Sequence, residues 1–196
     1  MIIVLSGYDG SGKTTLAREL VAELIRNGQK AEYVHGYEFS FIHGILRRFR
    51  KRIESGELMR EHDRKGSKRW YMRIWPYCLC LDFSFKLFIY KYLFIRKIYV
   101  FDRYIYDYLL SCYYQGYKLP LTLMLATVPS PSYGFWLKPS LDFSLKNRAA
   151  EHHRKYFEEI AALYDRHLPN NMSLVETGRD SVSEDLEKIL AKIDFK

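Results

Sequence analysis

The chain has few cysteines and no segment that resembles a signal peptide. Its three cysteines, Cys78, Cys80 and Cys112, are odd in number and lack the spacing of a zinc site. This pattern fits a reducing, cytoplasmic compartment in which the thiols are small apolar fillers. The apolar run at the start, residues 2–5, is only one strand long, and no internal repeat or low-complexity tract is present. The composition therefore does not predict a secreted scaffold or a repeat array.

The sequence also lacks an uninterrupted apolar run long enough to cross a bilayer. Residues 77–95 are apolar and aromatic, but Asp82, Lys86 and Lys91 fall within them, and each charge is costly at the centre of a membrane. We therefore expect no transmembrane helix and no membrane partner. The segment predicts a buried helix whose lysines extend outward, with an interfacial membrane helix as the alternative.

Strand-like and helix-like segments alternate along the chain. Its 196 residues fit one domain, 1–196. The alternation favours an α/β fold with about five parallel strands joined by right-handed crossovers. Predicted strands are 2–5, 30–35, 97–102, 133–137 and 172–175. Predicted helical segments are 16–25, 41–53, 57–75, 77–95, 104–115, 140–167 and 181–193. Residues 117–132 hold three prolines and are predicted to be partly loop, whereas Ser181 and Glu184 predict a capping box.

The most specific pattern is a glycine-rich loop at residues 7–15. Gly7 is followed after four residues by Gly12-Lys13-Thr14, between an apolar run and a helical segment. The N–H groups of such a loop and the helix dipole hold phosphates, while the lysine adds a positive charge and the threonine ligates magnesium. A chance match in a glycine-bearing turn is the alternative, against which the flanking segments argue. The predicted ATP contacts are Gly7, Gly10, Ser11, Gly12, Lys13, Thr14 and Thr15.

The net charge of +8 is concentrated in one segment. Residues 47–73 hold 11 basic and 4 acidic side chains, which leaves +7 there, and Trp70, Tyr71 and Trp75 lie beside the charges. A solvated helix surface explains most such runs. A site for a phosphate-bearing substrate and a nucleic-acid surface with stacking rings are the two functional alternatives, of which we favour the substrate.

Two motifs give the chain a resemblance to the thymidylate kinase family of P-loop kinases. One is the loop 7–15, with Asp9 two residues after the first glycine; the other is Phe101-Asp102-Arg103-Tyr104 at the end of the third predicted strand. The resemblance covers most of the chain and implies a three-layer P-loop NTPase fold with a short helical lid at about 140–156. Residues 36–97, the implied acceptor-binding region, match the family poorly.

The resemblance implies roles for the charged residues near the strand ends. Asp102 would hold magnesium through water together with Thr14, or orient the acceptor. Arg103 would bind the acceptor phosphate, and Asp9 would reach the acceptor sugar hydroxyl. The structural alternatives are a helix cap for Asp102 and an ion pair with Asp102 or Asp107 for Arg103.

The implied lid supplies the remaining positive charge. The loop has no arginine, so Arg148 and Arg154 are expected to reach the γ-phosphate when the lid closes. Thr177-Gly178 resembles the loop that packs against adenine. The predicted catalytic residues are Lys13, Asp102, Arg103, Arg148 and Arg154, and the further acceptor contacts are Tyr104 and Arg47.

The departures from the family lie on the acceptor side. His35-Gly36 follows the second strand where the family usually has an arginine, and Asp82-Phe83 stands in place of an Asp-Arg pair. The expected function is ATP- and magnesium-dependent phosphoryl transfer to a nucleoside monophosphate, dTMP to dTDP, as in nucleotide biosynthesis. The alternatives are a kinase of another small acceptor, a nucleoside or another metabolite, and a nucleotide-binding switch or nucleic-acid-binding protein. The resemblance also suggests a homodimer, with 77–95 as a candidate surface.

Overall fold

Five parallel strands form one sheet in the order β2-β3-β1-β4-β5. The structure, a computed structural model, describes residues 1–36, 39, 70–93, 97–114, 116, 119–140, 143, 154–169, 171–178 and 181–194. The strands are β1 (Ile2–Ser6), β2 (Ala31–His35), β3 (Ile98–Asp102), β4 (Tyr133–Pro139) and β5 (Met172–Thr177). The described helices are α1 (Lys13–Arg26), α3 (Trp70–Leu93), α4 (Ile105–Tyr114), α5 (Leu121–Thr127), α7 (Arg154–His167) and α8 (Val182–Leu190). The predicted α/β fold with five parallel strands is confirmed.

The register brings the carboxyl ends of three strands to one level. Leu5 of β1 and His35 of β2 both lie opposite Asp102 of β3. β4 continues beyond the end of β1, so that Pro139 pairs with Thr177 of β5. Because all strands are parallel, the segments that follow them meet at the same edge of the sheet, where open α/β sheets bind ligands.

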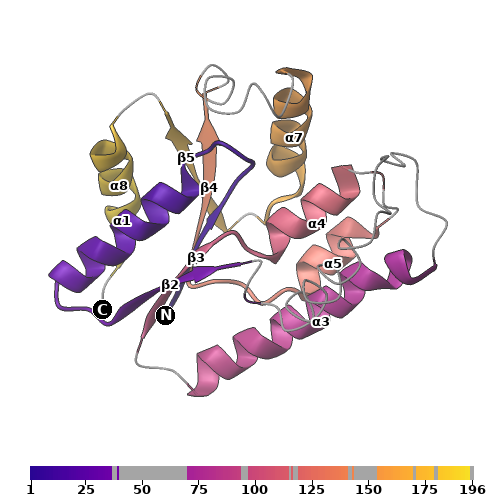
Figure 1. Cartoon of the computed structure of the whole chain (residues 1–196), viewed down its shortest axis with the longest axis horizontal. Coiled ribbons are helices and arrows are strands. Elements are labelled where there is room, and N and C mark those ends of the chain that lie inside the picture. Colours follow the sequence, from indigo (N-terminus) through magenta and orange to yellow (C-terminus); the bar gives the residue numbers. More distant parts are fainter. Residues whose placement is uncertain are drawn as a thin grey trace, which may run out of the picture.

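The helices cover the two faces of the sheet in different groups (Figure 1). α1 and α8 lie on one face, and α3, α4, α5 and α7 lie on the other. Alternate residues of β1 point to opposite faces, so Ile3 and Leu5 pack with α1 and α8, whereas Val4 packs with the second group. The core between the sheet and α3, α4, α5 and α7 holds most of the buried aromatic rings. Edge-to-face contacts there join Phe101 to Phe39 and Tyr104. This layering is like that of Rossmann and P-loop proteins.

Two prolines lie inside elements where the sequence predicts boundaries. The predicted separation of the helical segments 57–75 and 77–95 is wrong, because α3 continues through Pro76. Proline inside a helix removes a hydrogen bond and costs about 3 kcal/mol, which the burial of Leu79, Phe83 and Leu87 offsets. β4 likewise runs to Pro139 instead of ending at Leu137. Beyond the end of β1 this part of β4 pairs with β5, and a proline is tolerated there.

The structure contains a short helix, α5, in a segment predicted to be partly loop, and it contains the predicted capping box at the start of α8. α5 lies within 117–132, and it forms because Leu121, Met124 and Leu125 bury one face between flanking prolines. The capping box of Ser181 and Glu184 at α8 is confirmed.

Two of the three cysteines, Cys80 of α3 and Cys112 of α4, lie in the core as predicted, whereas Cys78 is partly exposed. Cys80 and Cys112 are buried free thiols, and burial raises the pKa of each to about 11. Neutral thiols of this kind pack as small hydrophobic side chains.

Lys86 does not extend outward from α3, contrary to the prediction. Its ammonium lies 4.9 Å from the centre of the Phe39 ring and contacts the carbonyl oxygen of the same residue. Burial lowers the pKa of Lys86. The inward position is stabilised because the carbonyl oxygen and the aromatic face replace part of the lost hydration.

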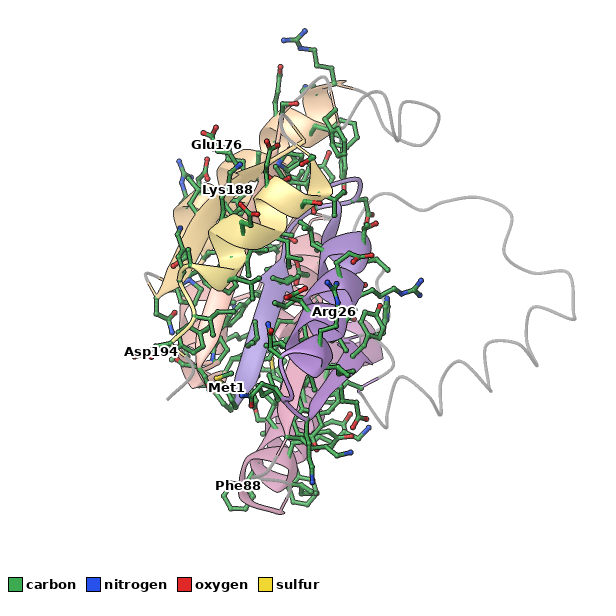
Figure 2. The ribbon with its side chains drawn as sticks, turned by 90° about the vertical axis from the view of Figure 1, so that its left-hand side faces the viewer. Met1, Arg26, Phe88, Glu176, Lys188 and Asp194 are labelled. Carbon is green, nitrogen blue, oxygen red and sulfur yellow. The ribbon has the colours of Figure 1, made fainter. Side chains whose placement is uncertain are left out.

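The outer face of α3 carries large apolar side chains. Tyr77, Leu81, Phe85 and Phe88 are exposed, Leu81 to 72% of its full area. Figure 2 shows Phe88 near one end of the molecule, away from the labelled residues of the other elements. The predicted homodimer would use this face, and it stays a prediction. Among the described residues, no helix has both the length and the hydropathy required to cross a membrane.

Candidate functional site

The glycine-rich loop connects β1 to α1 at the carboxyl edge of the sheet. Gly10 and Gly12 have φ angles of 86° and 81°, a backbone region that L side chains rarely adopt. A side chain at Gly7 is excluded for another reason, since its Cβ would lie 2.7 Å from the carbonyl oxygen of Leu137 and 2.8 Å from Oγ of Ser11. The three glycines are therefore required by the geometry of the loop.

Lys13 is the first residue of α1 and is 4% exposed. Its Nζ donates to the carbonyl oxygen of Tyr8 at 2.6 Å and to Oγ of Ser11 at 3.0 Å. Burial lowers the pKa of Lys13 to about 8, and the positive charge of Arg103 acts in the same direction. The loop thus holds its cation close to its own backbone, next to the positive end of the α1 dipole.

Asp102, the last residue of β3, contacts both α1 and β2 at this edge. Its carboxylate is fully buried, and Oδ2 accepts hydrogen bonds from Oγ1 of Thr14 at 2.6 Å and from the Tyr33 hydroxyl at 2.8 Å. Oδ1 is buried without a hydrogen-bond partner within the described part of the chain. Burial, followed by the contact with Asp102, raises the pKa of Tyr33 to about 12, so this phenol is a donor near neutral pH. A buried carboxylate oxygen beside a threonine hydroxyl is a donor set that suits a hard divalent cation.

Arg103 adopts an unusual backbone conformation and reaches the glycine-rich loop. Among the described residues it is the one non-glycine residue with positive φ, at 73°. Such a conformation costs of order 1–3 kcal/mol and persists where the surroundings enforce it. The guanidinium forms an ion pair with Asp9, not with Asp102 or Asp107, the two partners considered from the sequence. Gly36 packs directly against this turn, because any Cβ there would overlap the carbonyl oxygen of Arg103.

The end of β5 lies against the same loop. Oγ1 of Thr177 donates to the carbonyl oxygen of Ser11 at 3.2 Å. Gly178 has a φ of 81°, and its N–H donates to the buried carboxylate of Asp185 at 3.4 Å. Phe143 packs over Gly178 so closely that a Cβ on the glycine would lie 2.5 Å from the ring. The structure therefore brings Thr177 to the loop, whereas the contacts of Gly178 are with Asp185 and Phe143.

The remaining predicted residues lie elsewhere. Tyr104 is buried, with its hydroxyl donating to the carbonyl oxygen of Pro129 at 2.7 Å. Thr15 is an exposed residue of α1. Arg154 begins α7, where its side chain is 67% exposed and pairs with Glu158. Arg47 and Arg148 fall outside the described residues, as does most of the predicted lid.

Two side chains at the site, Tyr33 and Asp107, are not among the residues predicted from the sequence motifs. Tyr33 contacts Asp102 because β2 and β3 are neighbours, and no local pattern announces that pairing. Asp107 accepts from the N–H groups of Gly7 and Tyr104. A signal for Asp107 does exist, since an acidic residue three positions after a helix start is typical of a cap. That spacing predicts the contact with Tyr104 but not the one with Gly7.

The described residues contain no cluster of three or more acidic, histidine or cysteine side chains that could enclose a metal by themselves. Compared with models of protein families, the chain matches none, and no curated protein matches it.

Proposed function

We propose that the protein is an ATP- and magnesium-dependent kinase of a nucleoside monophosphate, with dTMP as the first candidate acceptor, built on a three-layer P-loop NTPase fold with a helical lid. The observation that carries the proposal is the 2.6 Å hydrogen bond from Thr14 to Asp102. It joins the threonine after the loop lysine to a carboxylate at the end of the neighbouring strand. Nucleoside triphosphate sites of this fold use that pair of groups around the bound metal.

The loop and its lysine are suited to the donor phosphates. Phosphoryl transfer requires positioned positive charge more than covalent chemistry by the protein. The backbone turn at Gly10 and Gly12, the buried ammonium of Lys13 and the α1 dipole are directed at one place. Thr177 adjoins the loop and Gly178 follows it in the chain, in agreement with a role near the donor base.

The groups around Asp102 fit magnesium. The buried Oδ1, which has no hydrogen-bond partner among the described residues, and the Thr14 hydroxyl are hard oxygen donors. Magnesium prefers such donors in combination with water and phosphate. When bound there with ATP, the ion neutralises charge on the β- and γ-phosphates. The Tyr33 hydroxyl holds Oδ2 in place from the other side.

Asp9 and Arg103 form the acceptor side of the proposed site. An incoming phosphate would replace the Asp9 carboxylate on the guanidinium, and Asp9 would then be free to accept from an acceptor hydroxyl. An oxygen of the acceptor phosphate attacks the γ-phosphorus, and the bond to the β-phosphate oxygen breaks, leaving ADP. Arg148 and Arg154 are proposed to approach the γ-phosphate when the lid closes.

A kinase of another small acceptor is the second candidate. It is favoured by one observation, the close packing of Gly36 on Arg103 at the end of β2, where the resemblance implies an arginine. An acceptor without a phosphate would leave the ion pair of Asp9 and Arg103 intact. The two candidates therefore differ in what happens to that pair.

The test is release of ADP by the purified protein in the presence of Mg-ATP. A panel of dTMP, dUMP, other monophosphates, thymidine and simple sugars is compared with background hydrolysis. A response to dTMP well above background is expected. A response confined to an unphosphorylated acceptor would support the second candidate, and no response to any acceptor would contradict both.

A lid variant tests the proposed role of Arg148. Arg148→Ala should lower kcat more than it weakens ATP binding, because the arginine is proposed to act on the γ-phosphate in the closed state. Arg26→Ala is the control, since that arginine lies at the far end of α1. An unchanged kcat would remove Arg148 from the catalytic set.

A further inference from the structure

Asp107 is a buried carboxylate to which the proposed chemistry gives no role. It is 2% exposed and lies in the first turn of α4. Its Oδ1 accepts from the N–H of Gly7 at 2.8 Å and from the Tyr164 hydroxyl at 2.6 Å, and its Oδ2 accepts from the N–H of Tyr104 at 2.8 Å. Three donors, one from the glycine-rich loop, one from the turn before α4 and one from α7, therefore converge on one side chain.

The negative charge of Asp107 stands close to a loop proposed to bind anions. By itself such a charge would repel phosphate and be costly to bury. The three hydrogen bonds disperse it, and the bond from Gly7 directs the N–H of the first loop glycine toward the protein interior. Asp107 therefore fixes where the loop leaves β1, through the backbone of Gly7.

Helix α7 holds the same loop at a second point. The ring of Tyr8, the residue after Gly7, lies 5.8 Å from that of Phe157 and 6.4 Å from that of Tyr164, between ring centroids. Tyr164 itself stacks on Trp136 of β4 at 4.5 Å with an interplanar angle of 14°. One face of α7 thus touches the loop through aromatic packing and, through the Tyr164 hydroxyl, through Asp107.

We propose that Asp107 and Tyr164 are positioning residues of the glycine-rich loop, through which helix α7 sets the affinity of the loop for the phosphates of a nucleotide. The inference rests on the proposed function. It assigns a role to two residues that do not contact the reacting atoms. α7 begins at Arg154, so the last residues of the proposed lid belong to the helix that holds the loop.

The decisive variant is Tyr164→Phe, which removes the hydroxyl and leaves the ring to stack on Trp136. We expect the dissociation constant for Mg-ADP, measured by isothermal titration calorimetry, to rise about tenfold, the effect of one lost hydrogen bond to a buried charge. The KM for ATP should rise in the same proportion while the acceptor KM stays within about twofold.

Two further variants and a control separate positioning from mere stability. Asp107→Ala should weaken Mg-ADP more than Tyr164→Phe does, and Asp107→Asn should partly restore binding because its amide oxygen still accepts from Gly7 and Tyr164. Tyr133→Phe is the matched control, since that hydroxyl bonds to the backbone of Asp194 at the opposite end of β4. It should leave Mg-ADP binding unchanged.

The results distinguish failure of the positioning role of Asp107 and Tyr164 from failure of the proposed function. If Tyr164→Phe and Asp107→Asn melt at lower temperature but bind Mg-ADP as the wild type does, the two residues only stabilise the fold and the inference is overturned. If Asp107→Ala does not fold, Tyr164→Phe and Asp107→Asn decide. Wild-type protein that binds neither Mg-ADP nor Mg-ATP would contradict the proposed function, and this inference with it.

Discussion

The two sides of the proposed site differ in how firmly their charged groups are held. On the donor side, Lys13 is buried and bonded to the loop backbone, and Asp102 is buried and bonded to α1 and β2. On the acceptor side, Asp9 and Arg103 are partly exposed and bonded to each other across a strained turn. Groups that are already held in place lower the free-energy cost of binding a ligand that is always the same, as the phosphoryl donor is. Two charged side chains that pair with each other can instead exchange that partner for a charged ligand. The comparison suggests a preorganised donor side and an acceptor side that rearranges on binding.

The largest effect is expected from removing the donor cation. Lys13→Ala should lower kcat/KM at least about 100-fold, because it removes the charge directed at the β- and γ-phosphates. The measurement is steady-state ADP release with the best acceptor. Lys192→Ala, on the exposed turn after α8, is the control and should leave the rate unchanged. A small effect of Lys13→Ala would mean that the donor side does not depend on its buried cation.

The acceptor side should respond to a double-mutant cycle. Asp9→Asn and Arg103→Gln, singly and together, should raise the acceptor KM about 10- to 100-fold, the range for a charge-assisted hydrogen bond, while ATP binding changes little. Each group is expected to contact the acceptor after the pair opens. Equal losses in ATP and acceptor binding would contradict the division of the site into two sides.

The pH dependence of ATP binding provides a third test, on the donor side alone. The pKa of Lys13 is lowered to about 8 by burial and by Arg103, while Asp107, Asp9 and Asp102 act in the opposite direction. Phosphates favour the charged amine, so above pH 8 binding must take up a proton, and affinity should fall by up to about tenfold per pH unit. Calorimetry in buffers of different ionisation enthalpy measures this uptake. Affinity that stays constant between pH 8 and 9 would contradict it.

The lowered pKa of Lys13 also affects the stability of the fold, but stability changes with pH in the direction opposite to ATP affinity. Between pH 8 and the ordinary lysine pKa of 10.5, the unfolded chain keeps its proton on Lys13 while the folded chain has lost it. Through this group, the free energy of unfolding therefore rises with pH over that window. Urea unfolding of the ligand-free wild type and of Lys13→Met, compared across the window, isolates the contribution.

The smallest effect is expected from Tyr33, whose hydroxyl donates to the carboxylate of Asp102. Tyr33→Phe removes one of the two hydrogen bonds to Oδ2 of Asp102, and we expect the magnesium concentration for half-maximal rate to rise about threefold. The acceptor KM should not change if Asp102 belongs to the donor side. A change in the acceptor KM alone would instead assign Asp102 to orienting the acceptor.

The elements themselves were largely predictable, and their ends were less so. Runs such as Ile2–Leu5 are too apolar and β-branched for another assignment, and the periodic leucines of α1 leave little choice. The continuation of α3 through Pro76 was not predictable, because a local penalty was outweighed by burial against residues far along the chain. Lys86 turned inward for a similar reason, since its partner Phe39 lies 47 residues away.

The sequence by itself determined the glycine-rich loop, because all of its determinants, the turn glycines, the lysine and the following helix, are contiguous between Gly7 and Arg26. Only the tertiary structure decided what surrounds that loop. The pairing of Gly7 with Asp107 spans 100 residues, and that of Tyr33 with Asp102 spans 69. Such contacts depend on strand order and on which helix covers which face, and these follow from the packing of the whole chain and not from any local pattern.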